Sequence, residues 1–582
     1  MIWDDVGMAA PVFEAGQRVP DNWHYVVTGQ DYAPVIKRLL DRGQEITVDI
    51  ETTGLYFDKH RFRGVGLTDG VEAWYTPWEI FCANDDSELL FDLNRCVLIA
   101  HNSKFEMKWF GSRGYTIPDR MHDTMILSHI VAPQLPRKSL DYLAKNILGV
   151  QEWKQKKPQD CNNDELFPHC CGDVWYTHAL FKYFEPKLGP RRPLYEMEQR
   201  LLAILASMEI YGMPINVEGI IAKSIELGKQ AEDIRQEIYT MTGGDPWNTK
   251  SLPTVRYKLK ELGIPIPPSL TKDTLKAIQH PLGAKLLELR GVEKLKRTYA
   301  DGILTKQENG RVSCDFNQCG TETGRLSCSK PNLQNIPKSD FRNFFINPSP
   351  PETELIVADY SQLELRIFAH YAKEKAMIQA FRAGQDIHSV TAATMFGVVL
   401  ENVTPKQRQI AKNINFGIIY GMGARKLAWS IEQATGEPCE VETARELLEQ
   451  YYSTYPAVRE LQKYSTWLVE RRAMAANSRY GWVENFYHRR RYVETNSAYT
   501  ALNTVIQGTA GDFVKMRMVA LADLLRGTKS YMVAQVHDEI IFVHWKEENL
   551  ISTIVETMED RETFTVHLTV NYGTGESWRE AK

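Results

Sequence analysis

Two apolar segments that carry carboxylates, far apart in the chain, constrain its fold more than any other feature. The segment ELIVAD (354–359) ends in Asp359, and the apolar runs YMVAQV and EIIFVH are separated by His537 and Asp538. Such runs are typical of buried strands, and the two-residue break is typical of a tight hairpin. Because an unpaired strand exposes its backbone groups, we expect the two segments to pair across the mostly helical region between them.

The chain is long enough for several domains, and its local pattern changes along it. At 582 residues we expect roughly three to five domains of about 100 to 200 residues each. Residues 1–190 alternate short apolar runs such as ITVDIETTGL with helical patterns, which is typical of an α/β domain. From about 192 to 300, apolar residues recur every three or four positions, which predicts an arm of long helices. The last segments, YMVAQV, EIIFVH and FTVHLTVNY, are predicted strands.

The charge balance limits how the chain could contact nucleic acid. Charged residues make up 25% of the chain and its net charge is −5, which argues against a protein that coats nucleic acid through bulk positive charge. A local channel would have to supply the contact. Basic runs at 154–157, 294–297 and 489–491 are candidates, although each run is more often a solvated face.

Neither a secretory signal nor a membrane span is visible in the sequence. The first thirty residues lack a basic start followed by an apolar core, so we expect an intracellular, cytoplasmic protein. Nine cysteines in a chain of this length are typical of free thiols. Cys161, His169, Cys170 and Cys171 lie close together but lack the usual spacing of a zinc finger, so ordinary thiols are the preferred interpretation.

Asp359 and Asp538, with Glu539 beside the second, are candidate metal ligands. Two carboxylates brought together repel each other unless divalent cations lie between them, and Mg²⁺ prefers such oxygen ligands. A pair of ions about 3.5 to 4 Å apart can activate a 3′-hydroxyl and stabilise a departing pyrophosphate. The alternative is that each Asp is a turn residue or a helix cap.

A second candidate site lies on the segment TPKQRQIAKNINFGIIYGMG (404–423). Arg408, Lys412, Phe416 and Tyr420 are spaced by four, so on a helix they form a stripe with two cations followed by two aromatic rings. Such a stripe can bind phosphates at one end and stack on a base at the other. The alternative is an amphipathic helix whose cations reach to solvent.

Three strings resemble the motifs of a known family. DYSQLELRI (359–367), RQIAKNINFGIIYG (408–421) and QVHDEII (535–541) resemble motifs A, B and C of the family A DNA polymerases, in the same order. TETGRLSCSKPNLQNIP (321–337) resembles the segment that precedes motif A. The resemblance implies template-directed DNA synthesis from a primer by a right-hand polymerase.

The resemblance also implies roles for individual residues. Asp359 and Asp538 would bind metal, with Glu539 beside them, and Glu364 would crowd a ribose 2′-hydroxyl. The implied nucleotide-binding residues are Arg408, Lys412, Phe416, Tyr420, Glu364, Gln362 and His537. The implied DNA-binding residues are Arg325, Asn503, Gln507 and Tyr499, with His537 also near the primer end. Tyr499 departs from the pattern because many relatives have Arg four residues before the Asn, and YHRRRY (487–492) could supply that charge instead.

A second set of acids lies near the start of the chain. Asp49 and Glu51 are two residues apart on a predicted strand, so both carboxylates point to one face. VDIETTGL (48–55), AHNSKFEMKWF (100–110) and HCCGDVWYTHALF (169–181) resemble the motifs of a ribonuclease-H-like 3′-5′ proofreading exonuclease, and SLDYLA (139–144) also resembles a family segment. The implied catalytic residues are Asp49, Glu51, Glu106, Asp173 and His169, of which Asp49, Glu51 and Asp173 would bind metal.

Two positions of this second site depart from the family pattern. Glu106 stands where Asp is usual, and His169 stands where Tyr is usual. An extra methylene moves a carboxylate by about one bond, whereas catalytic geometry tolerates about 0.5 Å. Two hypotheses follow: a proofreading polymerase, or an editing-deficient polymerase adapted to damaged templates whose exonuclease domain is structural. A third, a catalytically silent nucleic-acid clamp, is disfavoured because all three polymerase acids are present.

The resemblance implies a multidomain α/β and α+β architecture. The expected domains are a 3′-5′ exonuclease-like domain (1–190), a thumb (191–302), a first palm segment (303–371), fingers (372–492) and a second palm segment (493–582). We expect two Mg²⁺ ions in the polymerase site and two in an active exonuclease site. Primer-template DNA and dNTPs are the expected partners of a monomer, and an unidentified processivity or replisome factor is left open. A 5′-nuclease domain is not recognised, which is typical of a phage or other dedicated polymerase, although a shortened chain would look the same.

Overall fold

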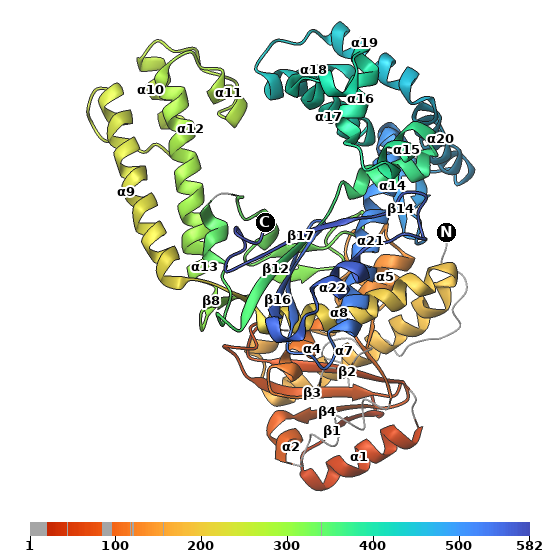
Figure 1. Ribbon diagram of the computed structural model, residues 1–582. Helices are drawn as coiled ribbons and strands as arrows, with labels where there is room; N and C mark the ends of the chain where they lie inside the picture. Colours follow the sequence, from red (N-terminus) through yellow and green to blue (C-terminus); the bar gives the residue numbers. More distant parts are fainter. Residues whose placement is uncertain are drawn as a thin grey trace.

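The computed structural model describes residues 20–42, 45–83, 96–116, 118, 121–154, 156–338 and 340–582. Two helical arms stand on either side of a central sheet, and a separate α/β unit lies below it (Figure 1). The first nineteen residues of the predicted 1–190 domain and Gln155 of the basic run at 154–157 lie outside the described residues. Of the helices in the described ranges, none combines the length and the apolar character that crossing a bilayer requires.

The lower unit is the predicted α/β domain. Its mixed six-stranded sheet has the order β1-β4-β3-β2-β5-β6, and β2 is antiparallel to β3 but parallel to β5. The helix α7 (Asn163–Phe184) packs on β2, β3 and β4 and begins with a capping box between Asn162 and Glu165. The strands are β1 (Trp23–Tyr25), β2 (Glu45–Thr52), β3 (Phe62–Thr68), β4 (Ala73–Pro77), β5 (Val97–Ala100) and β6 (His122–Asp123). The other helices are α1 (Gly29–Arg42), α2 (Trp78–Ala83), α4 (Lys104–Gly111), α5 (Thr124–Val131) and α6 (Leu140–Leu143).

The central sheet joins the two apolar segments that the sequence predicted to pair. Its order is β15-β16-β12-β17, made of β15 (Tyr531–Val536), β16 (Glu539–Trp545), β12 (Thr353–Tyr360) and β17 (Val570–Gly575). The strand β12 is antiparallel to β16, with Asp359 opposite Glu539, so the predicted pairing across the helical region is confirmed. The predicted two-residue hairpin is also confirmed, because Val536 pairs with Glu539 around His537 and Asp538.

The predicted strand FTVHLTVNY forms only at its last three residues. The strand β17 begins at Val570, and the residues before it contribute one isolated bridge, Asp560 to Leu568. Phe564 is buried in an aromatic cluster whose ring centroids lie 5.2 Å away for Phe486 and 5.8 Å away for Phe513. The apolar residues that suggested a strand are therefore buried as a loop against helices.

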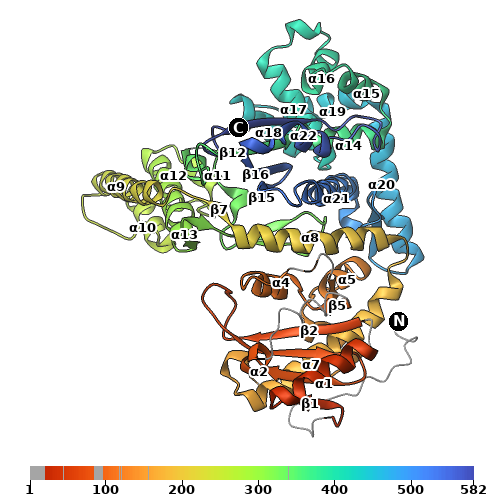
Figure 2. The ribbon, with the colours of Figure 1, turned by 60° about the horizontal axis from the view of Figure 1, so that its bottom comes forward.

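The first arm is helical, as the sequence predicted, but it begins later than residue 191. The helices α9 (Val217–Met241) and α12 (Pro281–Lys294) pack on each other, with α10 (Leu252–Glu261) and α11 (Lys272–Lys276) at the tip (Figure 1). The helix α8 (Arg192–Tyr211), which falls in the predicted thumb range, instead runs between the lower unit and the central sheet (Figure 2). It contacts α4 on one side and α21 (Ala501–Leu524) on the other.

The second arm is inserted between β12 and β15. It contains α15 (Lys375–Arg382), α16 (Ile387–Phe396), α17 (Pro405–Ile419), α18 (Ala424–Thr435), α19 (Val441–Thr454) and α20 (Pro456–Ala475). A hairpin of β13 (Tyr480–Glu484) and β14 (Arg490–Glu494) then leads the chain back. The helices α14 (Leu363–Ala372) and α21 pack on each other, and α22 (Ile551–Met558) packs on α21. The arrangement places the end of β12 between the two arms (Figure 1).

Candidate active sites

The acids that the sequence predicted to meet lie at one end of the central sheet. Asp359 is opposite Glu539 in the ladder, and the backbone amide of Tyr360 donates to the carbonyl oxygen of Asp538 at 3.2 Å. Burial and the charge of Asp359 raise the pKa of Asp538 to about 7. The turn that presents Asp538 is tight, because His537 adopts a φ of 62°.

Glu539 is more fully paired within the protein than the other two acids. Trp578 Nε1 donates to Glu539 Oε1 at 2.6 Å, and Arg342 Nη1 lies 3.5 Å from the same oxygen. Lys582 contacts Glu539 and lies 3.2 Å from Asp359 Oδ2. Sequence reasoning missed these three partners, because they are far from motif C in the chain and no local pattern marks them. Asp359 and Asp538 are therefore the two acids better placed to bind a cation.

Residues from three other segments interact with Glu364 at the start of α14. Arg325 forms an ion pair with Glu364, and Tyr420 Oη donates to Glu364 Oε2 at 3.4 Å. The charge of Glu364 also acts on Asp538. Gln507 on α21 hydrogen-bonds to Tyr420. The structure thus brings together predicted site residues from before motif A and from motifs A, B and C.

Two predicted ligand-binding residues have unpaired buried oxygens within the described part of the chain. Gln362 Oε1 and Asn503 Oδ1 lack hydrogen-bond partners there, although buried polar atoms are normally paired. Gln362 also has a positive φ of 53°. Neither oxygen is used by a partner within the described part of the protein.

The stripe on α17 is present, with one difference from the prediction. Thr404 and Gln407 form a capping box at its start, and Arg408 and Lys412 lie on the solvent side. Arg408 Nε is 2.7 Å from Asp386 Oδ2, so this cation is already held in place. The helix ends at Ile419, and Tyr420 follows it as the C-cap residue, so the fourth member of the stripe is not helical.

Tyr499 is exposed, and its backbone approaches the end of motif B. Gly421 has a φ of 65°, and a Cβ there would lie 2.8 Å from the carbonyl oxygen of Tyr499. Only glycine fits this close approach without a shift of the backbone. The structure therefore joins Tyr499 to the segment that carries Tyr420.

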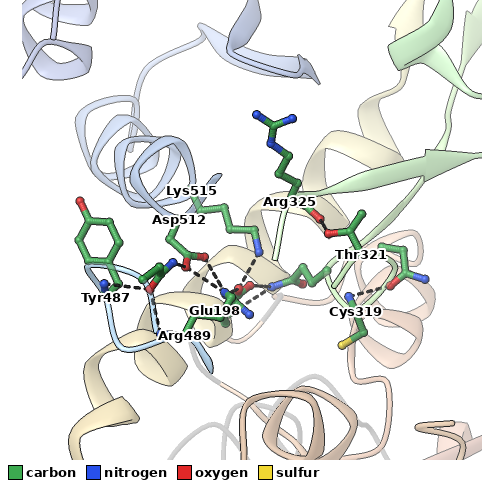
Figure 3. Close-up of polar contacts among 11 residues, drawn as sticks. Glu198, Cys319, Thr321, Arg325, Tyr487, Arg489, Asp512 and Lys515 are labelled. Atoms are coloured by element: carbon green, nitrogen blue, oxygen red, sulfur yellow. Dashed lines mark hydrogen bonds and ion pairs between the residues drawn. The ribbon is translucent and has the colours of Figure 1, made fainter. Parts of the chain in front are cut away.

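Four buried charges lie below Arg325 in the view of Figure 3. Glu198 and Lys515 are each 1% exposed, Asp512 is 0% exposed and Arg489 is 6% exposed. Lys515 Nζ donates to Glu198 Oε1 at 2.6 Å, and Arg489 Nη2 donates to Asp512 Oδ1 at 2.7 Å and also contacts Glu198. We call these residues the buried charge cluster. It joins α8, α21 and the turn before β14.

The buried charge cluster supports the segment that carries Arg325. Gln318 Nε2 donates to Glu198 Oε2 at 2.6 Å, and Thr321 Oγ1 donates to the carbonyl oxygen of Arg325 at 2.8 Å. Gly324 has a φ of 82°, and a Cβ there would lie 2.2 Å from Arg489 Nε. Figure 3 shows the Arg325 side chain pointing away from the cluster.

Arg489 does not belong to a basic surface patch, for which the run 489–491 was a candidate, nor is it on a solvated face. Its guanidinium is buried in the cluster because it neutralises Glu198 and Asp512, which are far away in the sequence. Arg491 pairs with Glu322 and donates to Thr504. The idea that this run replaces the Arg missing at position 499 therefore lacks support at both of these arginines.

The second set of acids also comes together in space. Asp49 and Glu51 on β2 lie beside His169 and Asp173 on α7, and His169 Nε2 is 3.7 Å from both Glu51 Oε1 and Asp173 Oδ2. Glu106 on α4 is 2% exposed and lies within reach of the charge of Asp49. The predicted acids thus form one cluster between β2, α4 and α7.

Burial makes this acid cluster difficult to ionise without a cation. Burial, followed by the charge of Asp173, raises the pKa of Asp49 to about 8. Burial and the charge of Asp49 raise the pKa values of Glu51 and Glu106 well above their usual range. Bound divalent ions would favour the ionised forms, so the donor set fits metal binding.

Two residues that sequence reasoning missed hold Asp173 in place. Lys154 Nζ is 2.8 Å from Asp173 Oδ2, and Trp153 Nε1 donates to Asp173 Oδ1 at 2.7 Å. The sequence offered Lys154 only as part of the basic run at 154–157. Its neighbours there suggest a surface patch, so no local pattern predicts its role.

A clamp of charges joins α4 to α8. Lys104 contacts Glu209 and lies 3.0 Å from Asp315 Oδ1, and Lys108 Nζ is 2.7 Å from Glu209 Oε2. Glu106, two residues from each lysine, lies on the opposite side of the short helix and faces the acid cluster. The clamp therefore fixes the helix that presents Glu106.

Comparisons with known proteins agree with this architecture. Residues 218–580 match the model of the DNA polymerase family A, and residues 24–189 match that of the 3′-5′ exonuclease domain. DNA polymerase I of Synechocystis is 32% identical over 542 residues, which cover 83% of this chain and 53% of that protein. The thermostable DNA polymerase I of Thermus aquaticus is 36% identical over 79% of this chain and 55% of its own length. The chain thus spans about half the length of these relatives.

A solved structure resembles nearly the whole chain. It is described as the POL domain of Pol1 from M. smegmatis in complex with a DNA primer-template and dNTP, and it has a TM-score of 0.82 at 25% identity. The alignment covers 96% of this chain and 99% of that one. Since the polymerase model alone matches more than half of the chain, the protein belongs to the DNA polymerase family A, with a 3′-5′ exonuclease domain ahead of its polymerase domain.

Proposed function

We propose that this protein is a DNA-directed DNA polymerase that extends a primer by two-metal phosphoryl transfer and removes 3′-terminal nucleotides in its exonuclease domain. The main observation behind the proposal is that Arg325, Tyr420 and Asp538, from separate motifs, all interact with Glu364. Family membership and the likeness to a polymerase solved with primer-template DNA and dNTP support it.

Asp359 and Asp538 are the residues that would hold Mg²⁺ in the polymerase site. Two bound ions would lower the pKa of the primer 3′-hydroxyl and stabilise the leaving pyrophosphate. Glu539 completes the negative charge of the site, while Trp578, Arg342 and Lys582 fix its position. The protein thus contributes a rigid sheet end that keeps the carboxylates in place.

The substrates we propose are dNTPs and primer-template DNA. Arg408 and Lys412 would bind the triphosphate, and Phe416, Gln362 and His537 would contact the rest of the nucleotide. Tyr420 would also contact the nucleotide, and Arg325, Asn503, Gln507 and Tyr499 would contact the DNA. Donors at minor-groove positions meet acceptors that all correct base pairs share, so they test pair shape without reading sequence.

Glu364 gives the first testable prediction, which concerns sugar selection. Replacing Glu364 by Ala should raise ribonucleotide incorporation relative to deoxynucleotides by at least about tenfold, because the side chain that would crowd the 2′-hydroxyl is removed. Primer extension with each nucleotide type measures the ratio. Glu364→Gln is the matched control, since it keeps the size of the side chain but loses the charge that pairs with Arg325. An unchanged ratio in Glu364→Ala would contradict the assigned role.

A cleft lined by charged and aromatic residues opens beside the exonuclease acid cluster. A space of about 970 Å³ lies between the exonuclease domain and the first palm segment, and Asn102 and Lys154 beside the acid cluster are among its lining residues. Its other cations include Lys59, Lys108, Lys306 and Arg311, its acids include Asp58, Asp141, Glu209, Glu308 and Asp315, and its aromatic residues include Tyr56, Phe105 and Tyr211. Two of these cations are paired with acids of the lining, Lys59 with Glu308 and Lys108 with Glu209. Cations that follow a backbone and rings that stack on bases are the features of a single-strand binding groove. We propose that a frayed primer end occupies this cleft.

A labelled primer tests both activities on one gel. With Mg²⁺ and dNTPs the primer should lengthen, and without dNTPs a labelled single strand should shorten from its 3′ end. Asp49→Ala should reduce shortening by at least about a hundredfold, because it removes a metal ligand from the acid cluster. Asp538→Asn is the control for strand shortening. It should leave shortening unchanged, since the polymerase acids lie in a different domain. Failure of the unaltered chain to shorten the strand would favour the editing-deficient alternative.

A further inference from the structure

The exonuclease acid cluster contains two buried atoms that have no partner among the described residues. His169 is 3% exposed and Glu106 is 2% exposed, yet His169 Nε2 and Glu106 Oε2 make no hydrogen bond there. Buried polar atoms are almost always paired, so each of these atoms is expected to have a partner that is not part of the protein.

The spacing around His169 suits a shared metal ion better than direct hydrogen bonds. The 3.7 Å from His169 Nε2 to Glu51 Oε1 and to Asp173 Oδ2 is too long for a hydrogen bond. Two ligands at about 2.1 Å from a tetrahedral ion lie about 3.4 Å apart, which is close to the observed separation. The ligand atoms of Glu51, His169 and Asp173 all lie within 4.8 Å of one another.

Another histidine on the same helix shows what an ordinary buried imidazole looks like here. His178 lies two and a half turns further along α7, and its Nδ1 is 3.1 Å from Thr47 Oγ1. Its polar atom is therefore satisfied by the protein. Among the described residues, His169 Nε2 lacks such a bond and instead faces two carboxylates.

The donor atoms of the cluster differ from the set that Mg²⁺ prefers. Mg²⁺ takes oxygen ligands, whereas imidazole nitrogen suits Zn²⁺ and similar transition ions. Cys170 adds sulfur, because its thiol lies 3.8 Å from Asp49 Oδ2, and Asp49, Glu51 and Cys170 form a second group within 4.8 Å. Lys154 also faces the cluster through Asp173 Oδ2 at 2.8 Å, so an arriving ion shares or displaces this contact.

We propose that Glu51, His169 and Asp173 bind a divalent transition ion of the Zn²⁺ or Co²⁺ type in preference to Mg²⁺. Cys170 places a soft donor near Asp49 and Glu51. The inference deepens the proposed exonuclease function and rests on it for its biological meaning, but its metal-binding content is tested separately.

The test uses Co²⁺ alone as the probe, because its visible absorption reports coordination. The sample is the full chain with the substitutions Asp359→Asn and Asp538→Asn. These remove the proposed metal ligands of the polymerase site and leave the exonuclease cluster intact. Added Co²⁺ should give bands that an equal concentration of Mg²⁺ does not displace. In that background His169→Phe should weaken Co²⁺ binding by at least about tenfold, the loss that even outer-shell changes cause. His169→Tyr, which restores an oxygen donor, should also weaken Co²⁺ binding relative to Mg²⁺.

His178→Gln is the matched control, since it changes a buried histidine of the same helix outside the donor set, and it should leave Co²⁺ binding unchanged. If the His169 variants bind Co²⁺ as tightly as the protein with His169, the inference is wrong. It is also wrong if equimolar Mg²⁺ displaces the bound Co²⁺. Circular dichroism shows whether each variant is folded. If His169→Phe does not fold, the Co²⁺ affinity of His169→Tyr tests the inference instead.

Strand shortening by the unaltered chain is measured in parallel with Mg²⁺, Co²⁺ and Zn²⁺. No shortening with any ion, together with His169-dependent Co²⁺ binding, rejects the exonuclease but supports the metal inference. If the strand shortens with Mg²⁺ and the His169 substitutions do not change Co²⁺ binding, the metal inference is rejected and the exonuclease is supported.

Discussion

Asp538→Asn should reduce primer extension by at least about a hundredfold to a thousandfold, the usual cost of losing a charge that stabilises the transition state. The substitution keeps the size of the side chain and removes its negative charge. Asp538 sits in a two-residue turn that connects β15 and β16, so an amide there can retain the hairpin while it weakens metal binding. Extension of a labelled primer with Mg²⁺ and dNTPs measures the loss.

Two controls make the Asp538 result specific. Shortening of a labelled single strand by the same variant should remain normal, because the exonuclease acids lie on β2, α4 and α7. Primer-template binding measured without nucleotides should change little, since Asp538 contributes no positive charge. Extension at the normal rate would mean that Asp359 and Asp538 do not hold the catalytic ions, and the proposed mechanism would be wrong.

The sequence predicted those parts of the fold that depend on the local pattern of apolar and polar residues. Alternation along β2 places Asp49 and Glu51 on one face, and an apolar run that ends in Asp359 leaves that acid at the sheet end. The two-residue break at His537 and Asp538 defines the hairpin in the same way. These predictions needed no knowledge of distant residues.

The partners of the predicted acids could not be found in this way. Lys154, Lys582 and Glu198 each pair with residues that are distant in the sequence, and a lone charged residue has no periodicity that marks its partner. The same limitation explains the interpretation of 489–491, because a run of arginines looks identical whether it faces solvent or a buried carboxylate. Local pattern also gave a wrong prediction at Phe564. This residue is buried in a loop, but the apolar sequence around it has the pattern of a strand.

Departures from a family pattern were visible in the sequence, but their consequences depend on geometry. His169 in place of a usual Tyr could be read as a change in how water is oriented. The structure adds that its Nε2 faces Glu51 and Asp173 at the same distance. That symmetry points to a shared ion, which no spacing rule in the sequence expresses.

The buried charge cluster gives the largest expected effect on stability. Arg489→Ala should lower the free energy of unfolding by about 3 to 5 kcal/mol, because removing one partner leaves Glu198 and Asp512 buried with less compensation. The pKa of Glu198, held at about 2 by Lys515 and Arg489 against the effect of burial, shows how strongly the partners favour its charge. Denaturant unfolding followed by a signal from the polymerase domain measures the change.

Arg491→Ala is the matched control for Arg489→Ala, since it removes the same side chain two residues away. Arg491 pairs with Glu322, whose side chain is 76% exposed, so its loss should cost only about 0 to 1 kcal/mol. Because Arg489 also fills the space under Gly324, its loss should weaken primer-template binding through the segment that carries Arg325. Equal unfolding midpoints for the two variants would show that the cluster is not what holds α8, α21 and this segment together.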